Sequence, residues 1–140
     1  MSCTPHDLYA LAHKLTHAED PCETELRCAI SRAYYSALHS VTETFPKRED
    51  QFRANGESSH AEIIGRVTAF GNGIGPGRSD AALIAKLMPR LRRRRNDADY
   101  RLNEEVKKDE VCKILDRAKE VIDRCANVVR LQESSNRRIG

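Results

Sequence analysis

Hydrophobic residues recur along this sequence at intervals of three and four positions, which is the spacing of one face of an α-helix. One clear series consists of Leu26, Ile30, Ala33, Ala37 and Val41. A longer series near the C-terminus consists of Val111, Ile114, Leu115, Ala118, Val121, Ile122, Cys125 and Val128. No segment alternates hydrophobic and polar residues over the length of a strand. The pattern predicts an all-α fold, an up-and-down antiparallel bundle of four to five helices.

Capping residues and prolines give the expected boundaries of the first two helices. Thr4 before Pro5 is typical of a helix start, and Asp20-Pro21 predicts the end of that helix. The second helix is expected over about residues 22–41. The polar segment 46–57 has no helical period and is expected to be a loop.

The remaining helices have similar signals. Ser59 is expected to cap the third helix, with Glu62 completing a capping box. Ser79 is expected to cap the fourth, inside which Pro89 predicts a kink or a restart. The last helix is expected over about residues 109–131.

At 140 residues the chain is long enough for one domain with a hydrophobic core and too short for two. We expect residues 1–132 to form a single helical domain and the polar residues 133–140 to be a disordered tail. The glycine-rich run 71–77 lacks the Lys-Ser/Thr ending of a phosphate-binding loop and follows a helix instead of a strand. We therefore interpret it as a flexible connection.

Composition points to a reduced, cytoplasmic protein without a metal or cofactor. The five cysteines are odd in number and include no CxxC pair, which argues against a disulfide framework and a zinc finger. The sequence has neither a signal-peptide pattern at its N-terminus nor an apolar stretch long enough to span a membrane. His13 and His17 lie one helical turn apart, but no acidic third ligand stands at a matching spacing, so a surface role is favoured over metal binding.

The formal net charge is only +3, but the positive charge is concentrated. Five of the six residues from 90 to 95 are arginine, and such a local field attracts phosphates. The alternative is a solvated helix face, and charge alone favours that alternative. A polar stripe on the second predicted helix, formed by Cys28, Arg32, Tyr35 and His39, places hydrogen-bonding groups beside its hydrophobic face.

Three segments taken together resemble the HEPN family of small prokaryotic helical proteins. They are SRAYYSALHS (31–40), SSHAEIIG (58–65) and RRRNDADYRL (93–102), and the resemblance spans about residues 20–130. It implies an up-and-down helical bundle that is usually a homodimer, with paired motif segments facing each other across the dimer cleft. Many members are metal-independent endoribonucleases that act as toxins beside a nucleotidyltransferase-like antitoxin or in defence systems. Others are binding or scaffolding modules without catalysis.

The nuclease motif of that family is an arginine, often followed by a polar residue, and then a histidine a few positions on. Arg95-Asn96 matches its first half, but Asp99, Tyr100 and Arg101 occupy the places where the histidine would fall. Metal-free RNA cleavage moves a proton off the ribose 2′-hydroxyl, which suits histidine because its pKa lies near neutrality. His60 and His39 are the candidates to replace it, and each is also consistent with a structural or surface role.

If the protein is a nuclease of this kind, Arg95 and Asn96 are expected to hold the scissile phosphate, Asp99 and Tyr100 to orient it, and His60 is a further candidate catalytic residue. The residues expected to bind the nucleic acid are Arg32, Tyr35, Arg92, Arg93 and Arg94. The implied partners are RNA, a second copy of the chain and a nucleotidyltransferase-like antitoxin. The alternative function is a non-catalytic module for dimerisation or for binding a partner protein or a free nucleotide.

Arg95 itself has two interpretations. On a straight helix it lies in line with the hydrophobic residues of its segment, so it points toward a packed surface, where Asp99 one turn on is the nearest partner. Tyr100 lies about 140° round the same helix from Arg95. An Arg95–Asp99 pair that stiffens the bundle and a phosphate site at Arg95 are evenly matched on this geometry.

Overall fold

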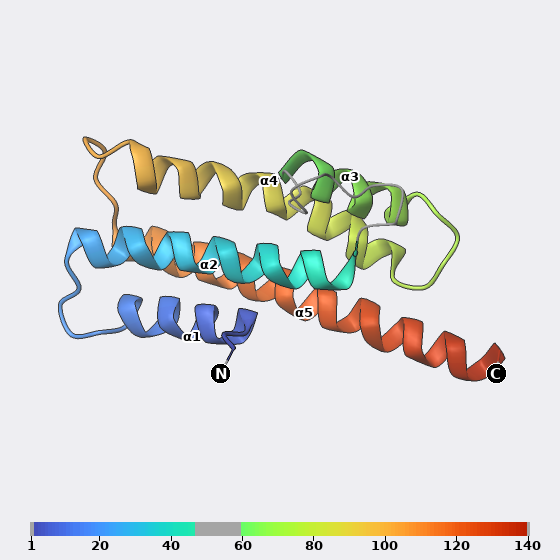
Figure 1. Cartoon of the computed structure of the whole chain (residues 1–140). Coiled ribbons are helices and arrows are strands. Elements are labelled where there is room, and N and C mark those ends of the chain that lie inside the picture. The colour runs from blue at the N-terminus through green and yellow to red at the C-terminus, as the bar shows by residue number, and fades with distance from the viewer. Residues whose placement is uncertain (1, 47–59, 140) are drawn as a thin grey trace.

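The computed structural model describes residues 2–46 and 60–139. Within them the chain forms five helices and no strand, which confirms the predicted all-α bundle (Figure 1). The helices are α1 (Pro5–Thr16), α2 (Glu23–Thr44), α3 (His60–Gly71), α4 (Arg78–Tyr100) and α5 (Lys108–Ile139). None of the described helices has an apolar stretch that would span a membrane.

Helix α2 lies at the centre of the bundle and packs against α1, α4 and α5 (Figure 1). Its core face is lined by small residues that are fully buried, namely Ala29, Ala33, Ser36 and Ala37. Small side chains let the neighbouring helices approach closely, and larger aliphatic residues of those helices fill the space between them. The largest of these buried aliphatic side chains are Ile84, Met88, Leu91, Val111, Val121 and Val128.

The start of α1 follows the prediction, and the start of α4 does not. Thr4 Oγ1 accepts a hydrogen bond from the Asp7 backbone N–H, and the Asp7 carboxylate accepts one from the Thr4 N–H. The N-cap of α4 is Gly77, with φ 91°, which lies two residues before the predicted cap Ser79. A Cβ at Gly77 would lie 3.2 Å from Val128 Cγ2, so both the backbone conformation and the contact with α5 require glycine. The cap predicted at Ser59 lies outside the described residues.

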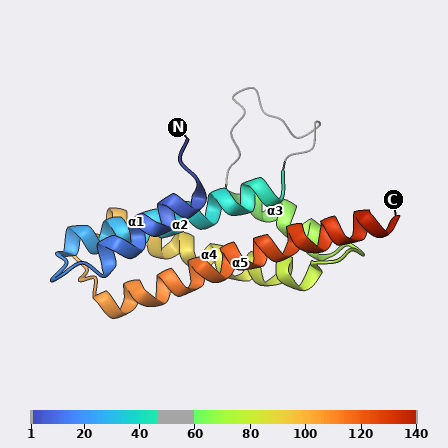
Figure 2. The ribbon, with the colours of Figure 1, turned by 90° about the horizontal axis from the view of Figure 1, so that it is seen from below.

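Two further boundaries differ from the sequence prediction. Of the kink or restart predicted at Pro89, the restart does not occur, because α4 is continuous through this residue. Helix α5 ends at Ile139 instead of near Leu131. Residues 133–139, expected to be a disordered tail, are therefore the last turns of α5, which extends beyond the end of α2 (Figure 2). Gln132 Nε2 donates to the Pro76 carbonyl at 3.3 Å, a contact between α5 and the loop before α4 that no local pattern reveals.

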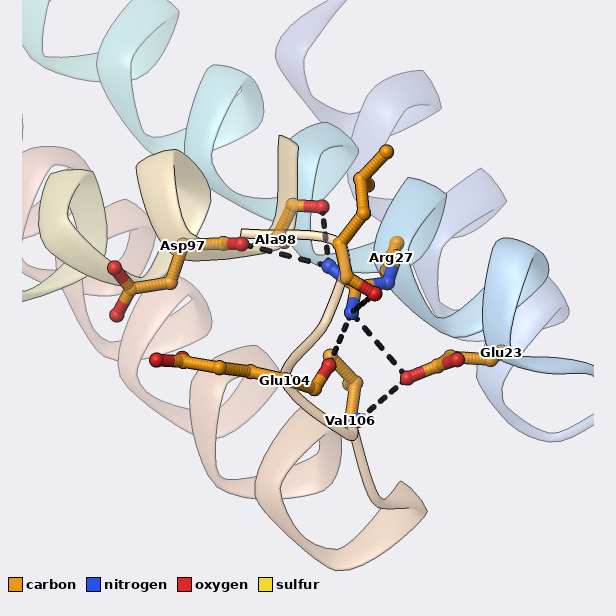
Figure 3. Close-up of polar contacts among 7 residues, drawn as sticks. Glu23, Arg27, Asp97, Ala98, Glu104 and Val106 are labelled. Atoms are coloured by element: carbon orange, nitrogen blue, oxygen red, sulfur yellow. Dashed lines mark hydrogen bonds and ion pairs between the residues drawn. The ribbon is translucent and has the colours of Figure 1, made fainter. Parts of the chain in front are cut away.

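The buried guanidinium of Arg27 ties α2 to the C-terminal end of α4 (Figure 3). It donates to the carbonyls of Asp97 (3.4 Å), Ala98 (2.8 Å), Leu102 (3.4 Å) and Glu104. The last carbonyls of a helix generally have no intrahelical donor, and Arg27 supplies N–H donors to carbonyls at the end of α4. Glu23, one turn before Arg27, pairs with its guanidinium at 3.3 Å and accepts from the Val106 N–H at 2.9 Å. One arginine thus fixes both the end of α4 and the connection to α5.

Asp80 forms a second buried polar contact, between α4 and α5. Its side chain is 3% exposed and accepts from Arg124 Nη1 at 3.0 Å and from Asn127 Nδ2 at 2.8 Å.

Asp80→Asn is expected to lower the free energy of unfolding by about 1–3 kcal/mol. The carboxylate accepts from both Arg124 and Asn127, whereas the amide of asparagine would direct an N–H donor toward one of these two donors. Urea unfolding measures this change. Asp123→Asn is the matched control, because Asp123 pairs with Lys119 at 3.1 Å on the exposed surface and its loss should cost less than about 0.5 kcal/mol. Equal destabilisation by the two variants would contradict the role given to Asp80.

Candidate functional site

The three segments that carry the family resemblance meet at one place in the bundle. Tyr34 of α2 has its hydroxyl oxygen 3.0 Å from Nδ1 of His60, the first residue of α3. The guanidinium carbon of Arg95, on α4, lies 5.2 Å from the centroid of the Tyr34 ring. We call Tyr34, His60 and Arg95, together with Tyr35 and Asp99 beside them, the Arg95 centre.

Two adjacent tyrosines form the aromatic side of this centre. Tyr34 is 2% exposed and belongs to the hydrophobic core, whereas Tyr35 is half-buried. Their rings meet edge to face with centroids 5.1 Å apart, and the Arg95 guanidinium carbon lies 5.6 Å from the Tyr35 centroid. A guanidinium at these distances from two rings gains cation–π attraction, which is strongest where water is excluded.

Arg95 also forms an ion pair with Asp99, which was one of its two interpretations from the sequence. Its Nη1 lies 3.5 Å from Asp99 Oδ2, and its side chain is 16% exposed. The Nε atom is buried and has no hydrogen-bond partner. Arg95 therefore keeps an unused donor although it already has a carboxylate and two aromatic rings as neighbours.

The surroundings of His60 favour its neutral form. Burial lowers the pKa of His60 below its ordinary value, and the positive charges of Arg92 and Arg95 lower it further. Burial raises the pKa of Tyr34, against the opposing effect of Arg95, so its phenol remains protonated. The hydrogen bond between them thus joins two neutral groups. In the tautomer in which His60 Nδ1–H donates to Tyr34, Nε2 has its lone pair free to accept a proton.

Acidification is expected to destabilise the protein through His60. Its folded-state pKa lies below the ordinary 6.5, so the unfolded chain takes up a proton at a higher pH than the folded chain does. This contribution is complete above about pH 6.5 and is lost as the pH falls through the lowered value. Thermal melts between about pH 8 and pH 5 should show a steeper fall in Tm for the wild type than for His60→Gln. Identical pH profiles of the two proteins would contradict this expectation.

Most of the other α4 residues that the sequence assigned to the site lie on a different face of this helix from Arg95. Arg92, Arg93, Asn96 and Tyr100 line an open groove of about 530 Å³ on the outer side of α4. Tyr100 is 76% exposed there, so it does not converge on Arg95 within one chain. Arg92 is close enough to both His60 and Tyr34 to shift their pKa values. Arg94 is exposed and lines neither the groove nor the Arg95 centre.

Arg32, Tyr35 and His39 from the predicted polar stripe of α2 line a separate pocket beside the Arg95 centre. The Arg32 guanidinium carbon lies 5.5 Å from the Tyr35 ring centroid. Within the described part of the chain no three histidine, cysteine or acidic side chains gather as metal ligands. The rings of His13 and His17 do lie next to each other, with centroids 4.3 Å apart.

Sequence reasoning selected Tyr35 and missed Tyr34. The signal was present, because Tyr34 lies four residues after Ile30 on the hydrophobic face of α2. A tyrosine on a core face needs a hydrogen-bond partner for its hydroxyl, and here that partner is His60. No family model matches this sequence, and no curated protein or solved structure matches it.

Proposed function

We propose that this protein is a HEPN-type, RNA-directed protein that cleaves RNA without a metal at the Arg95 centre. The observation that carries the proposal is the junction of three helices at which Tyr34 bonds to a neutral His60 beside the Arg95 guanidinium. A base, a group that orients it and a cation are the parts that such a reaction requires. His60 takes the place of the motif histidine that the sequence lacks.

The chemistry assigns one role to each side chain. His60 Nε2 accepts the proton of the ribose 2′-hydroxyl, and the 2′-oxygen attacks the phosphorus. The bond to the 5′-oxygen breaks and that oxygen takes a proton from water. The hydroxide so formed accepts the proton held by His60, and a cyclic phosphate and a free 5′-hydroxyl result. Arg95 and Arg92 stabilise the additional negative charge on the phosphate, while Asp99 orients the Arg95 guanidinium.

The family resemblance also supports a biological setting. In this proposal the protein is a cytoplasmic homodimer that brings two Arg95 centres to one cleft. It acts as a toxin beside a nucleotidyltransferase-like antitoxin or in a defence system. Tyr100 and Asn96 line the outer groove of α4. In the dimer, these residues of one subunit face RNA that is held at the Arg95 centre of the other.

A second candidate is a non-catalytic interaction module. The ion pair of Arg95 with Asp99 and the low exposure of the Arg95 side chain favour it, because both are also features of a structural arginine. In that case the same residues stiffen the bundle or its dimer seam, and the basic outer face of α4 contacts a partner.

RNA binding by two neighbouring arginine variants tests the proposal. Arg92→Ala should weaken binding and reduce the slope of log K against log salt by about one, because Arg92 is close to the Arg95 centre. Arg94→Ala removes the same charge about 200° round the helix from Arg92 and should leave binding nearly unchanged. Fluorescence anisotropy of labelled single-stranded RNA over a salt series gives both values. Equal effects of the two variants would favour a diffuse basic face over a defined site.

A further inference from the structure

A pocket of about 400 Å³ lies between the start of α1 and the polar face of α2. Cys3 and Leu8 line it on one side, and Arg32, Tyr35, His39 and Glu43 line it from α2. Its volume is large enough for a nucleobase with part of its sugar and too small for a folded peptide segment.

Tyr35 belongs both to the lining of this pocket and to the Arg95 centre. Its ring lies 5.5 Å from the guanidinium carbon of Arg32, which lines the pocket, and 5.6 Å from that of Arg95. The Arg32 Nε is buried and has no hydrogen-bond partner, as is also true of the Arg95 Nε. Two guanidinium groups therefore flank one tyrosine, an arrangement suited to a chain of phosphates that passes from one group to the other.

The rest of the pocket is not built for an anion. Leu8 is half-buried and gives an apolar wall, and the His39 ring lies 6.5 Å from the Tyr35 ring. Glu43 adds a carboxylate, which repels phosphate and accepts hydrogen bonds from N–H groups. A neutral heterocycle that carries N–H groups and is attached to a phosphate suits this lining, because its N–H groups match the Glu43 carboxylate and its phosphate matches the Arg32 guanidinium.

We propose that this pocket holds the base of the nucleotide next to the phosphate bound at Arg95, so that the protein acts on single-stranded RNA. Arg32 contacts the backbone between the two nucleotides, and Glu43 and His39 meet the edge of the base. Paired bases are stacked and cannot enter such a pocket, which excludes duplex RNA as the substrate. This inference rests on the proposed RNA-directed function and specifies its substrate.

The test uses a short uridine oligonucleotide made non-cleavable by deoxyribose, and the same oligonucleotide with each base removed in turn. Removing one particular base should raise Kd about tenfold for the wild type, the cost of a lost base contact. Leu8→Trp, which fills the pocket, should abolish that difference. His39→Ala should reduce it, whereas His13→Ala, on the exposed face of α1, should not. Circular dichroism shows whether Leu8→Trp is folded, and His39→Ala keeps the test valid if it is not.

The outcomes separate this inference from the proposed function. Arg95→Ala should weaken binding of all the probes by the same factor. If every base-deleted probe binds the wild type like the intact one while Arg95→Ala still weakens them all, the base pocket is wrong and the proposed function stands. If Arg95→Ala changes nothing, the proposed function fails and the pocket assignment fails with it. A uridine monophosphate that binds as tightly as the oligonucleotide would show a free-nucleotide site and overturn the RNA assignment.

Discussion

Replacing His60 with glutamine is expected to slow RNA cleavage by about a hundredfold to ten-thousandfold, the range typical of losing a general base. Glutamine has a similar polar reach and its amide can still bond to Tyr34, but it does not accept a proton near neutral pH. RNA binding should stay within about twofold of the wild type, because the proposed mechanism assigns the phosphate contacts to Arg95 and Arg92. The loss should therefore appear in kcat.

The pH dependence of the wild type gives the same residue a second test. The base must be unprotonated, so the rate should rise with pH through a pKa below the ordinary histidine value of 6.5 and then level off. His13→Gln is the control, because His13 is exposed and its ring contacts His17 and Tyr9 instead of the Arg95 centre. If His60→Gln cleaves RNA as fast as the wild type, His60 is not the base.

Replacing Arg27 with methionine is expected to lower the free energy of unfolding by about 2–4 kcal/mol. Methionine keeps the apolar stem but removes the donor to the carbonyl oxygens of Ala98, Leu102 and Glu104, while that of Asp97 keeps the Arg101 N–H. Lysine at this position should recover only part of the loss, because a single ammonium cannot reach the same set of acceptors as a planar guanidinium. Urea unfolding followed by circular dichroism measures all three proteins.

Arg101→Met is the matched control for Arg27. Its side chain is 64% exposed and pairs with Asp97 at 3.3 Å and Glu104 at 3.4 Å, two of the residues whose carbonyls Arg27 holds. Exposed ion pairs of this kind contribute at most about 1 kcal/mol. If the two methionine variants were equally stable, the end of α4 would not depend on Arg27.

The order of the helices, and their number as four to five, followed from the sequence because hydrophobic periodicity is a local signal. The starts of α1 and α2 depend on local residues as well, and both lie within a residue or two of the prediction. The start of α4 does not depend on local residues alone, because Gly77 is selected by its contact with Val128, more than fifty positions away. A serine two residues later is an equally good cap by local rules, so the sequence alone favoured Ser79.

The same distinction applies to the site. Motif spacing identified Arg95 and His60 separately, and helix geometry placed Asp99 beside Arg95 and Tyr100 away from it. The contact of His60 with Tyr34 joins positions 26 residues apart across a segment without helical period, so no spacing rule predicts it. Arg27 was overlooked for a similar reason, since its acceptors are backbone carbonyls some 70 residues further along the chain.

The most direct test of a metal-free nuclease centred on Arg95 is an RNA cleavage assay with EDTA present. Mixed single-stranded RNA is incubated with the wild type and with Arg95→Ala, and the products are separated by length and tested for a cyclic phosphate. We expect the wild type to cut the RNA in EDTA, to leave cyclic phosphate ends, and to lose this activity on removal of the Arg95 guanidinium. Intact RNA after incubation with folded wild-type protein at high concentration would contradict the nuclease assignment and leave the interaction module as the function to pursue.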